Sequence, residues 1–169
     1  LKDRVAVVTG GTRGIGYAIV KKYLENGAKV VLFGSKEESV NKAVQSLKAE
    51  NPDWVVEGMW PNLTDSEEME QAIAKVGEKY GRLDILVNNA GVSQSTKLED
   101  YQPEDFAGIM NLNVNALFNA IQPAVKIMRA QGGGVILNTS SMVSLYGQPS
   151  GVAYPTSKFA VNGLTVSLA

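Results

Sequence analysis

Short runs of apolar, mostly β-branched residues alternate along the chain with longer stretches in which apolar residues recur at helical spacing. The apolar runs predict buried strands at residues 5–8, 30–33, 55–60, 85–87 and 135–137. The longer stretches predict helices at residues 14–26, 36–50, 65–81, 103–130 and 154–169. Strands that alternate with helices in this way predict right-handed βαβ units. The expected fold is therefore α/β, a doubly wound parallel sheet of the Rossmann type, in a single domain over residues 1–169.

Two of the predicted helices carry local signals. Thr64 is expected to cap the N-terminus of the third helix. Asn111, Asn113 and Asn115 fall in the middle of the 103–130 stretch, where asparagine is mildly unfavourable. A kink or a chain of water molecules is expected to compensate these asparagines.

The composition excludes several classes of chemistry. The chain has no cysteine and no histidine, which excludes disulfides, zinc–thiolate sites, His-ligated metals and Ser-His-Asp hydrolysis. Its 16 basic and 17 acidic residues leave a net charge of −1, so no bulk field favours nucleic acid or an anionic membrane. No apolar run is long enough to span a membrane and no cleavable signal is visible, so a cytoplasmic protein is expected.

A glycine-rich loop, T-G-G-T-R-G-I-G at residues 9–16, joins the first predicted strand to the first helix. Gly10 permits a sharp turn, Gly14 lets the backbone approach a pyrophosphate, and Gly16 lets the helix pack closely on the sheet. The helix N-terminus offers N–H groups and a positive dipole end to phosphate. A plain glycine-rich turn could have the same sequence, but the position between a strand and a helix favours nucleotide binding.

The end of the second strand bears on the choice of nucleotide. An acidic residue that binds the ribose is expected about 20 residues past the glycines, and Ser35 stands there instead. Lys36 follows it, and Arg13 lies in the glycine loop. A hydroxyl flanked by two cations suits a 2′-phosphate, which favours NADP(H) over NAD(H). Glu37 and Glu38 count against this, and the alternative is that Lys36 is a solvated residue at a helix start.

Tyr154 and Lys158 are four residues apart and would share one face of a helix. A phenol is ordinarily too weak an acid to exchange protons readily at neutral pH, and a neighbouring ammonium favours its ionised form. Such a tyrosine could give a proton to a carbonyl oxygen or take one from an alcohol. Alone, this spacing is typical of any amphipathic helix, and it gains meaning only beside the glycine loop.

Polar residues follow two of the predicted strands, in the layer where active groups of parallel sheets gather. The segment N-T-S-S at residues 138–141 follows the fifth strand, and a hydroxyl there could hold a substrate oxygen as an alkoxide develops. The segment N-N-A-G at residues 88–91 ends the fourth strand, where small residues would let the backbone approach a cofactor. Both segments are also typical of ordinary turns.

With these motifs in this order and spacing, the chain resembles the short-chain dehydrogenase/reductase family from Arg4 to Ala169. The resemblance implies a catalytic tetrad of Asn113, Ser141, Tyr154 and Lys158. Tyr154 would be the acid–base, and Ser141, chosen over its neighbour by the family spacing, would hold the reacting oxygen. Lys158 would bind the nicotinamide ribose and favour the phenolate, and Asn113 would link Lys158 to a water relay.

The resemblance also implies which residues contact the cofactor. They are Gly10, Thr12, Arg13, Gly14, Ile15, Gly16, Ser35, Lys36, Asn62, Leu63, Asn89, Ala90, Gly91, Tyr154 and Lys158. Asn62 stands where the family often has an aspartate in contact with adenine, so adenine recognition is expected to be slightly altered. Family members continue through at least one more helix–strand unit that carries a substrate lid. The C-terminal portion is therefore expected to be missing, because a free parallel edge would favour aggregation.

The expected function is that of an NADP(H)-dependent oxidoreductase that interconverts a secondary alcohol and a ketone. Residues 33–34, 63–64 and 150–155 resemble bacterial bile-acid hydroxysteroid dehydrogenases, and an apolar wall for a steroid is available. The wall residues are Met142, Val143, Leu145 and Tyr146.

Two other functions stay open. A 3-oxoacyl-carrier-protein reductase should have a basic docking patch, for which Lys126 and Arg129 are the only weak candidates. A non-catalytic module would bind NADPH without turnover. As in related dimers and tetramers, the helices at 103–130 and 154–169 are expected to pair across a two-fold axis.

Overall fold

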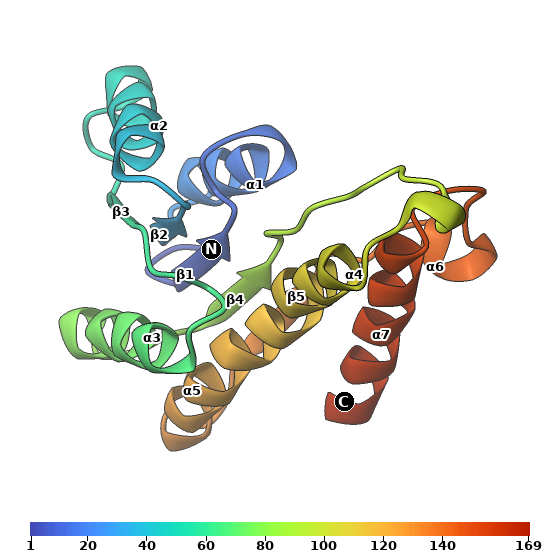
Figure 1. Ribbon diagram of the computed structural model, residues 1–169. Coiled ribbons are helices and arrows are strands. Elements are labelled where there is room, and N and C mark those ends of the chain that lie inside the picture. Colours follow the sequence, from blue (N-terminus) through green and yellow to red (C-terminus); the bar gives the residue numbers. More distant parts are fainter.

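The computed structural model describes residues 1–169 and contains one five-stranded sheet with helices on both faces (Figure 1). The strands are β1 Val5–Thr9, β2 Lys29–Phe33, β3 Val56–Met59, β4 Ile85–Asn88 and β5 Val135–Asn138. The longer helices are α1 Gly14–Glu25, α2 Glu37–Glu50, α3 Ser66–Tyr80, α4 Pro103–Met110, α5 Ala116–Ala130 and α7 Ala153–Leu168. The shorter ones are the 3-10 helix η1 Leu98–Asp100, the π-helical segment η2 Asn111–Asn115 and α6 Val143–Tyr146.

The strand order is β3-β2-β1-β4-β5, and every neighbouring pair is parallel. The chain starts in the middle of the sheet, runs outward to β3, and then returns to place β4 on the other side of β1. This reversal confirms the predicted doubly wound topology. In such sheets the crevice beyond the carboxyl ends of the strands, at the reversal point, is where ligands bind.

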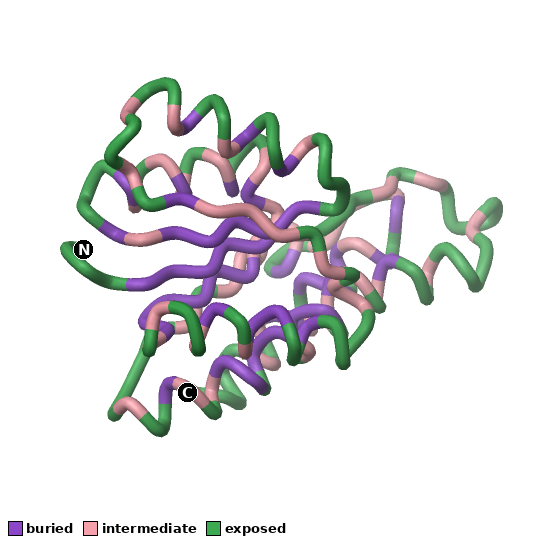
Figure 2. Tube along the Cα trace, turned by 90° about the vertical axis from the view of Figure 1, so that its left-hand side faces the viewer, coloured by how far each residue is buried: buried purple, intermediate pink, exposed green.

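Two apolar clusters hold the layers together, one on each face of the sheet (Figure 2). On one face, α1 and α2 pack on the sheet through Val20, Leu24, Val40 and Leu47. On the other, α3 and α5 cover it through Met69, Ile73, Ile121 and Met128. The central strands are almost continuously apolar because both of their faces are covered. β5 differs, since Val135 and Leu137 are 53% and 46% exposed.

One local prediction from the sequence is wrong. Asp65, not Thr64, caps α3, because the Asp65 carboxylate accepts hydrogen bonds from the N–H groups of Glu67 and Glu68 at 2.9 and 3.0 Å. The Thr64 hydroxyl donates to Asn62 Oδ1 at 2.8 Å instead. Ile15 is 68% exposed. It lies at the very start of α1, before the helix reaches the sheet.

The helix predicted over 103–130 consists of α4 and α5 joined by the π-helical turn η2. The expected distortion is therefore present, and it compensates the three asparagines. Asn113 is fully buried and hydrogen-bonded, while Asn115 Nδ2 donates to Asn111 Oδ1 at 3.0 Å. Single π turns inside α-helices occur frequently at functional sites. None of the helices is both long and apolar enough to cross a bilayer.

Candidate active site

The glycine loop is a tightly built cradle at the carboxyl end of β1. A Cβ atom on Gly16 would collide with the carbonyl oxygen of Gly10 and lie 2.6 Å from Asn89 Nδ2. This confirms that Gly16 allows close packing. Gly14 has a φ of +57° and nothing near it within 4 Å, so its bare backbone faces open space. The loop therefore presents backbone beside the N-terminus of α1, where anions bind readily.

Asn89 locks this loop to the neighbouring strands. Its side-chain Nδ2 donates to the carbonyl oxygens of Thr9 and Gly10 at 3.3 and 3.4 Å. Thr9 Oγ1 in turn accepts from the N–H groups of Asn89 and Ala90 at 3.0 and 3.1 Å. Sequence reasoning assigned Asn89 to cofactor contact only and missed Thr9. A buried threonine directly before the glycines was the available signal.

A cavity of about 730 Å³ opens at the carboxyl ends of the strands. Its lining includes the predicted cofactor residues Gly10, Thr12, Arg13, Gly14, Ile15, Ser35, Asn62, Leu63, Asn89, Ala90 and Gly91. Its lining also includes residues that the sequence did not single out as cofactor contacts: Phe33, Gly34, Trp60, Pro61, Glu68, Val92 and Leu112. Four predicted cofactor residues are not among the lining residues: Gly16, Lys36, Tyr154 and Lys158. The size is typical of a ligand or cofactor site.

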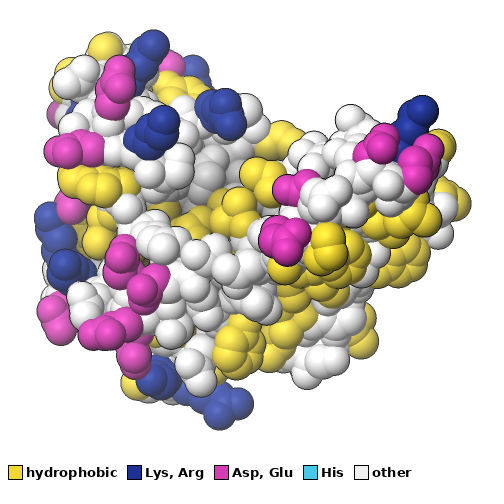
Figure 3. Space-filling view, in the orientation of Figure 1, with side chains coloured by type: hydrophobic (Ala, Val, Ile, Leu, Met, Phe, Trp, Pro, Cys, Tyr) yellow, Lys and Arg dark blue, Asp and Glu magenta, His cyan; other side chains and the backbone are white.

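Figure 3 shows a hollow between the part of the molecule that carries α1 and α2 and the arm that ends in α6. Lys and Arg side chains lie on the α1–α2 side of this hollow. Arg13 lines the cavity, while Lys36 lies outside its lining at the start of α2. Neither residue forms an ion pair with a carboxylate of the chain. Glu37 and Glu38 occupy the first turn of α2.

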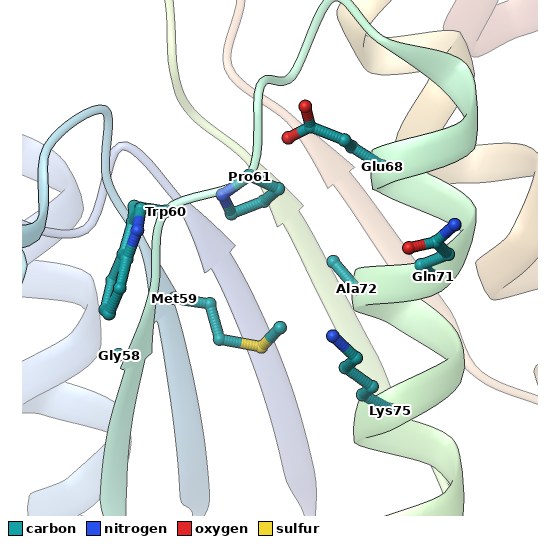
Figure 4. A pocket seen from close by; sticks show the side chains of 8 residues that line it. All are labelled: Gly58, Met59, Trp60, Pro61, Glu68, Gln71, Ala72 and Lys75. Atoms are coloured by element: carbon teal, nitrogen blue, oxygen red, sulfur yellow. The ribbon is translucent and has the colours of Figure 1, made fainter.

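The far end of the cavity is bordered by a second, smaller hollow of about 320 Å³ between β3 and α3. The two hollows share Trp60, Pro61 and Glu68. Figure 4 shows the Trp60 ring and the Met59 side chain on opposite sides of β3. Glu68 accepts a hydrogen bond from the backbone N–H of Asn62 at 2.8 Å. A carboxylate therefore stands beside Asn62, on a helix that sequence reasoning did not connect to the site.

Lys158 is the buried charge of the site, with only 5% of its surface exposed. Its Nζ donates to the carbonyl oxygen of Thr139 at 2.8 Å and lies 5.7 Å from the centre of the Tyr154 ring. Burial lowers the pKa of the Lys158 ammonium below its ordinary value. Both residues belong to α7, as predicted, and α7 thus presents a phenol and an ammonium beside the loop after β5.

Asn113 connects three segments of the site. Its Oδ1 accepts from the N–H of Val92 at 2.9 Å, and its Nδ2 donates to the carbonyl of Val92 at 2.8 Å and to Ser157 Oγ at 3.0 Å. A Cβ on Gly91 would lie 3.1 Å from Asn113 Oδ1 and 3.7 Å from Lys158 Nζ. The side chains of Asn113 and Lys158 therefore both lie close to Gly91, and no direct hydrogen bond joins them.

Ser140 and Ser141 differ in how they are used by the fold. Ser140 Oγ lies 3.2 Å from Ser144 Oγ and 3.3 Å from the carbonyl oxygen of Lys158, so it is engaged within the protein. Ser141 Oγ only accepts a weak hydrogen bond from the N–H of Val143 at 3.4 Å. Its hydroxyl proton is left for an external acceptor. This geometry favours Ser141 over Ser140 as the hydroxyl that meets a substrate.

Comparison with known proteins identifies the family of the chain. A family profile described as short chain dehydrogenase matches residues 4–169. The chain is 61% identical over its whole length to a 3alpha-hydroxysteroid dehydrogenase of Mediterraneibacter gnavus, of which it covers 68%. It is 35% identical over 98% of its length to a 3-oxoacyl-[acyl-carrier-protein] reductase of Thermotoga maritima, of which it covers 66%. The chain thus spans about two thirds of the length of these relatives.

Solved structures give the same result. A metagenomic short-chain oxidoreductase in complex with NADP superposes with a TM-score of 0.93 at 33% identity, over all of this chain and 76% of that one. NAD+-bound xylitol dehydrogenase gives a TM-score of 0.94 at 30% identity, over 99% of this chain and 64% of that one. The chain therefore belongs to the short-chain dehydrogenase/reductase family.

Proposed function

We propose that the protein is an NADP(H)-dependent oxidoreductase that interconverts a secondary alcohol and a ketone of a hydroxysteroid. The observation that carries this proposal is the position of Tyr154 and Lys158 on α7. Lys158 Nζ lies 5.7 Å from the centre of the Tyr154 ring and 3.7 Å from where a Cβ on Gly91 would stand, and Gly91 lines the cavity. The name of the 61% identical relative supports the substrate class.

The cavity fits a dinucleotide phosphate. The bare backbone at Gly14, the N-terminus of α1 and the volume of about 730 Å³ provide phosphate contacts and space for both nucleosides. Ser35 and the guanidinium of Arg13, which forms no ion pair, would supply hydrogen bonds to a 2′-phosphate. Lys36, outside the lining at the start of α2, would add positive charge nearby. When bound, the nicotinamide supplies or accepts the hydride.

The chain's own residues move the proton. In the reducing direction the Tyr154 phenol gives its proton to the carbonyl oxygen of the substrate, and in the oxidising direction it takes one from the alcohol. The Lys158 ammonium, fixed by the Thr139 carbonyl, favours the phenolate and would hold the nicotinamide ribose when the cofactor is bound. The Ser141 hydroxyl donates to the reacting oxygen where negative charge develops. Asn113 supports Lys158 through a water relay.

Changing Tyr154→Phe tests the chemistry. The variant keeps the ring and loses the proton donor, so turnover of a 3-oxo bile acid with NADPH should be abolished while NADPH binding stays nearly intact. The assay uses the protein at its native length, with fluorescence titration for binding. Retained turnover in this variant would refute the assigned role.

Changing Arg13→Ala and Lys36→Ala tests the 2′-phosphate. Each charge-assisted hydrogen bond lost is worth about 1.5–3 kcal/mol, so NADPH affinity should fall about tenfold to a hundredfold while NADH affinity changes little. Lys42→Ala, an exposed change on the same helix α2, is the matched control. Equal losses for both cofactors would reject NADP(H) and favour NAD(H).

The apolar surface next to Ser141 supports a steroid substrate. Met142, Leu145 and Tyr146 are 75%, 65% and 81% exposed, in one short segment beside the site, and Val143 between them is half-buried. Apolar side chains exposed together beside a polar centre are typical of a ligand-binding surface. A steroid nucleus offers a rigid apolar face of matching character.

A second candidate is a 3-oxoacyl-carrier-protein reductase, favoured by the 35% identical relative of that name. Lys126, one of its two basic candidates, is paired with Glu70 at 2.7 Å, which weakens the docking patch. A panel with NADPH decides: reduction of a 3-oxo bile acid supports the steroid, and reduction of a 3-oxoacyl thioester alone supports the carrier substrate. Binding of NADPH without any turnover would indicate a non-catalytic module.

A further inference from the structure

The segment that carries Ser141 is attached to α7 by a series of side-chain hydrogen bonds. Asn138 Nδ2 donates to Thr165 Oγ1 at 3.0 Å, before Ser141 in the chain. Lys158 Nζ binds the carbonyl of Thr139, also before Ser141. Beyond Ser141, the attachment depends on a different pair of residues.

That pair is Ser144, on α6, and Asn162, one turn after Lys158 on α7. Asn162 Nδ2 donates to Ser144 Oγ at 2.9 Å, and Ser144 Oγ donates to the carbonyl oxygen of Ser141 at 2.6 Å. The N–H of Ser144 donates to the same carbonyl at 3.0 Å. Ser144 is only 4% exposed.

The hydrogen-bonding capacity of Ser144 is fully used. A serine hydroxyl has one proton to donate and two lone pairs that accept. The proton goes to the Ser141 carbonyl, and the lone pairs face Asn162 Nδ2 and Ser140 Oγ. The Ser141 side chain has only the weak hydrogen bond from the N–H of Val143, so the place of its hydroxyl is determined mainly by the backbone on either side.

We propose that Ser144 and Asn162 are positioning residues that fix Ser141 relative to Tyr154. The phenol is carried by α7 and the serine by the loop after β5, so the distance between the two reacting groups depends on how that loop is attached to the helix. The bridge from Asn162 through Ser144 to the Ser141 backbone is the attachment on the α6 side. The inference rests on the proposed function.

Its loss should affect turnover and leave cofactor binding unchanged. Misplacement of a reacting group by about 1 Å can lower a rate about a hundredfold. We expect Ser144→Ala and Asn162→Ala to lower kcat between about tenfold and a hundredfold. The Kd of NADPH should stay unchanged, because neither residue lines the cofactor cavity.

The test measures kcat, KM and the Kd of NADPH for the protein at its native length, reducing a 3-oxo bile acid. The double variant should be no slower than the worse single one, because each change breaks the same bridge. Ser167→Ala is the matched control, since this exposed hydroxyl on α7 only donates to the carbonyl of Gly163 at 2.8 Å. It should keep the wild-type kcat.

Several outcomes overturn the inference. They are an unchanged kcat in both single variants, additive losses in the double variant, or an equal loss of NADPH affinity. If Ser144→Ala fails to fold, Asn162→Ala decides alone, because Asn162 is half-exposed. Tyr154→Phe separates the two proposals: activity retained there refutes the proposed function, whereas an inactive Tyr154→Phe with fully active Ser144→Ala refutes only the positioning role.

Discussion

Asp84 stands at the start of β4 and joins three strands at the end of the sheet opposite the cofactor cavity. Its carboxylate accepts hydrogen bonds from the Arg82 side chain at 2.7 and 2.5 Å, from Arg4 Nη1 at 2.9 Å and from the N–H of Val5 at 2.9 Å. Its backbone N–H also donates to Val5, and its carbonyl accepts from Val135. With 8% of its side chain exposed, Asp84 is a nearly buried charge that is well compensated.

This arrangement makes the contribution of Asp84 to stability depend on pH. The hydrogen bonds from Arg82 lower the pKa of Asp84 from 3.8 to about 2, against the opposing effect of burial. At about 1.4 kcal/mol per unit, the ionised carboxylate stabilises the folded state by about 2 kcal/mol at neutral pH. Because the folded pKa is the lower one, this contribution is complete above about pH 5 and is lost as the pH falls from about 4 to 2.

Replacing Asp84→Asn removes the charge and keeps the size. We expect the free energy of unfolding to fall by about 2 kcal/mol at pH 7, and the deficit relative to wild type to be about halved near pH 3. Urea titrations at pH 7, 5 and 3 measure it, with Asp53→Asn, a change in an exposed turn, as the control. A deficit that is the same at pH 7 and pH 3 would refute the argument, because the loss would then come from packing and not from charge.

Two other predictions concern the loop and the assembly. Gly16→Ala puts a Cβ against the Gly10 carbonyl, so we expect the free energy of unfolding to fall by about 1–3 kcal/mol and NADPH to bind more weakly. Urea unfolding and fluorescence titration measure the two effects. Unchanged NADPH binding would contradict the role of the glycine loop in holding the cofactor. Static light scattering of the native-length protein should give a dimer or tetramer, with Phe118→Asp on the exposed side of α5 lowering the mass. A monomeric wild type would contradict self-association through α4–α5 and α7.

The order of elements could be predicted because the strands are short apolar runs. Helices cover both faces of the sheet, so both faces of a central strand have to be apolar. The glycine loop could be predicted because Gly16 has no room for a side chain. Helix starts were less certain: Thr64 and Asp65 are both good capping residues, and only the backbone geometry selects Asp65. The four-residue helix α6 is too short to leave any periodic pattern.

Some residues of the site were not predicted because they are far apart in the sequence and form no motif of fixed spacing. Only the fold brings them together. Trp60, directly after β3, and Leu112, on η2, line the cavity, and neither belongs to a motif. Glu68 is an acidic residue in the first turn of α3, which is a common position for such residues. Its place in the lining of the cavity therefore leaves no separate signal in the sequence. The side chain of Asn89 binds the Thr9 and Gly10 carbonyls. This structural role differs from the cofactor contact that the motif predicts.

The π-helical turn η2 has a consequence for which changes of length the protein can accept. The π turn offsets the phase of α4 from that of α5, which lets α4 face α7 while α5 faces α3. An i→i+5 turn takes up one residue more than an i→i+4 turn, so deleting one residue between Asn111 and Asn115 would restore a regular helix. It would also remove the wide turn from which Asn113 binds Val92 and Ser157. Surface loops tolerate insertions and deletions readily. We therefore expect insertions and deletions among homologous proteins to occur in the loops and to be absent from residues 111–115.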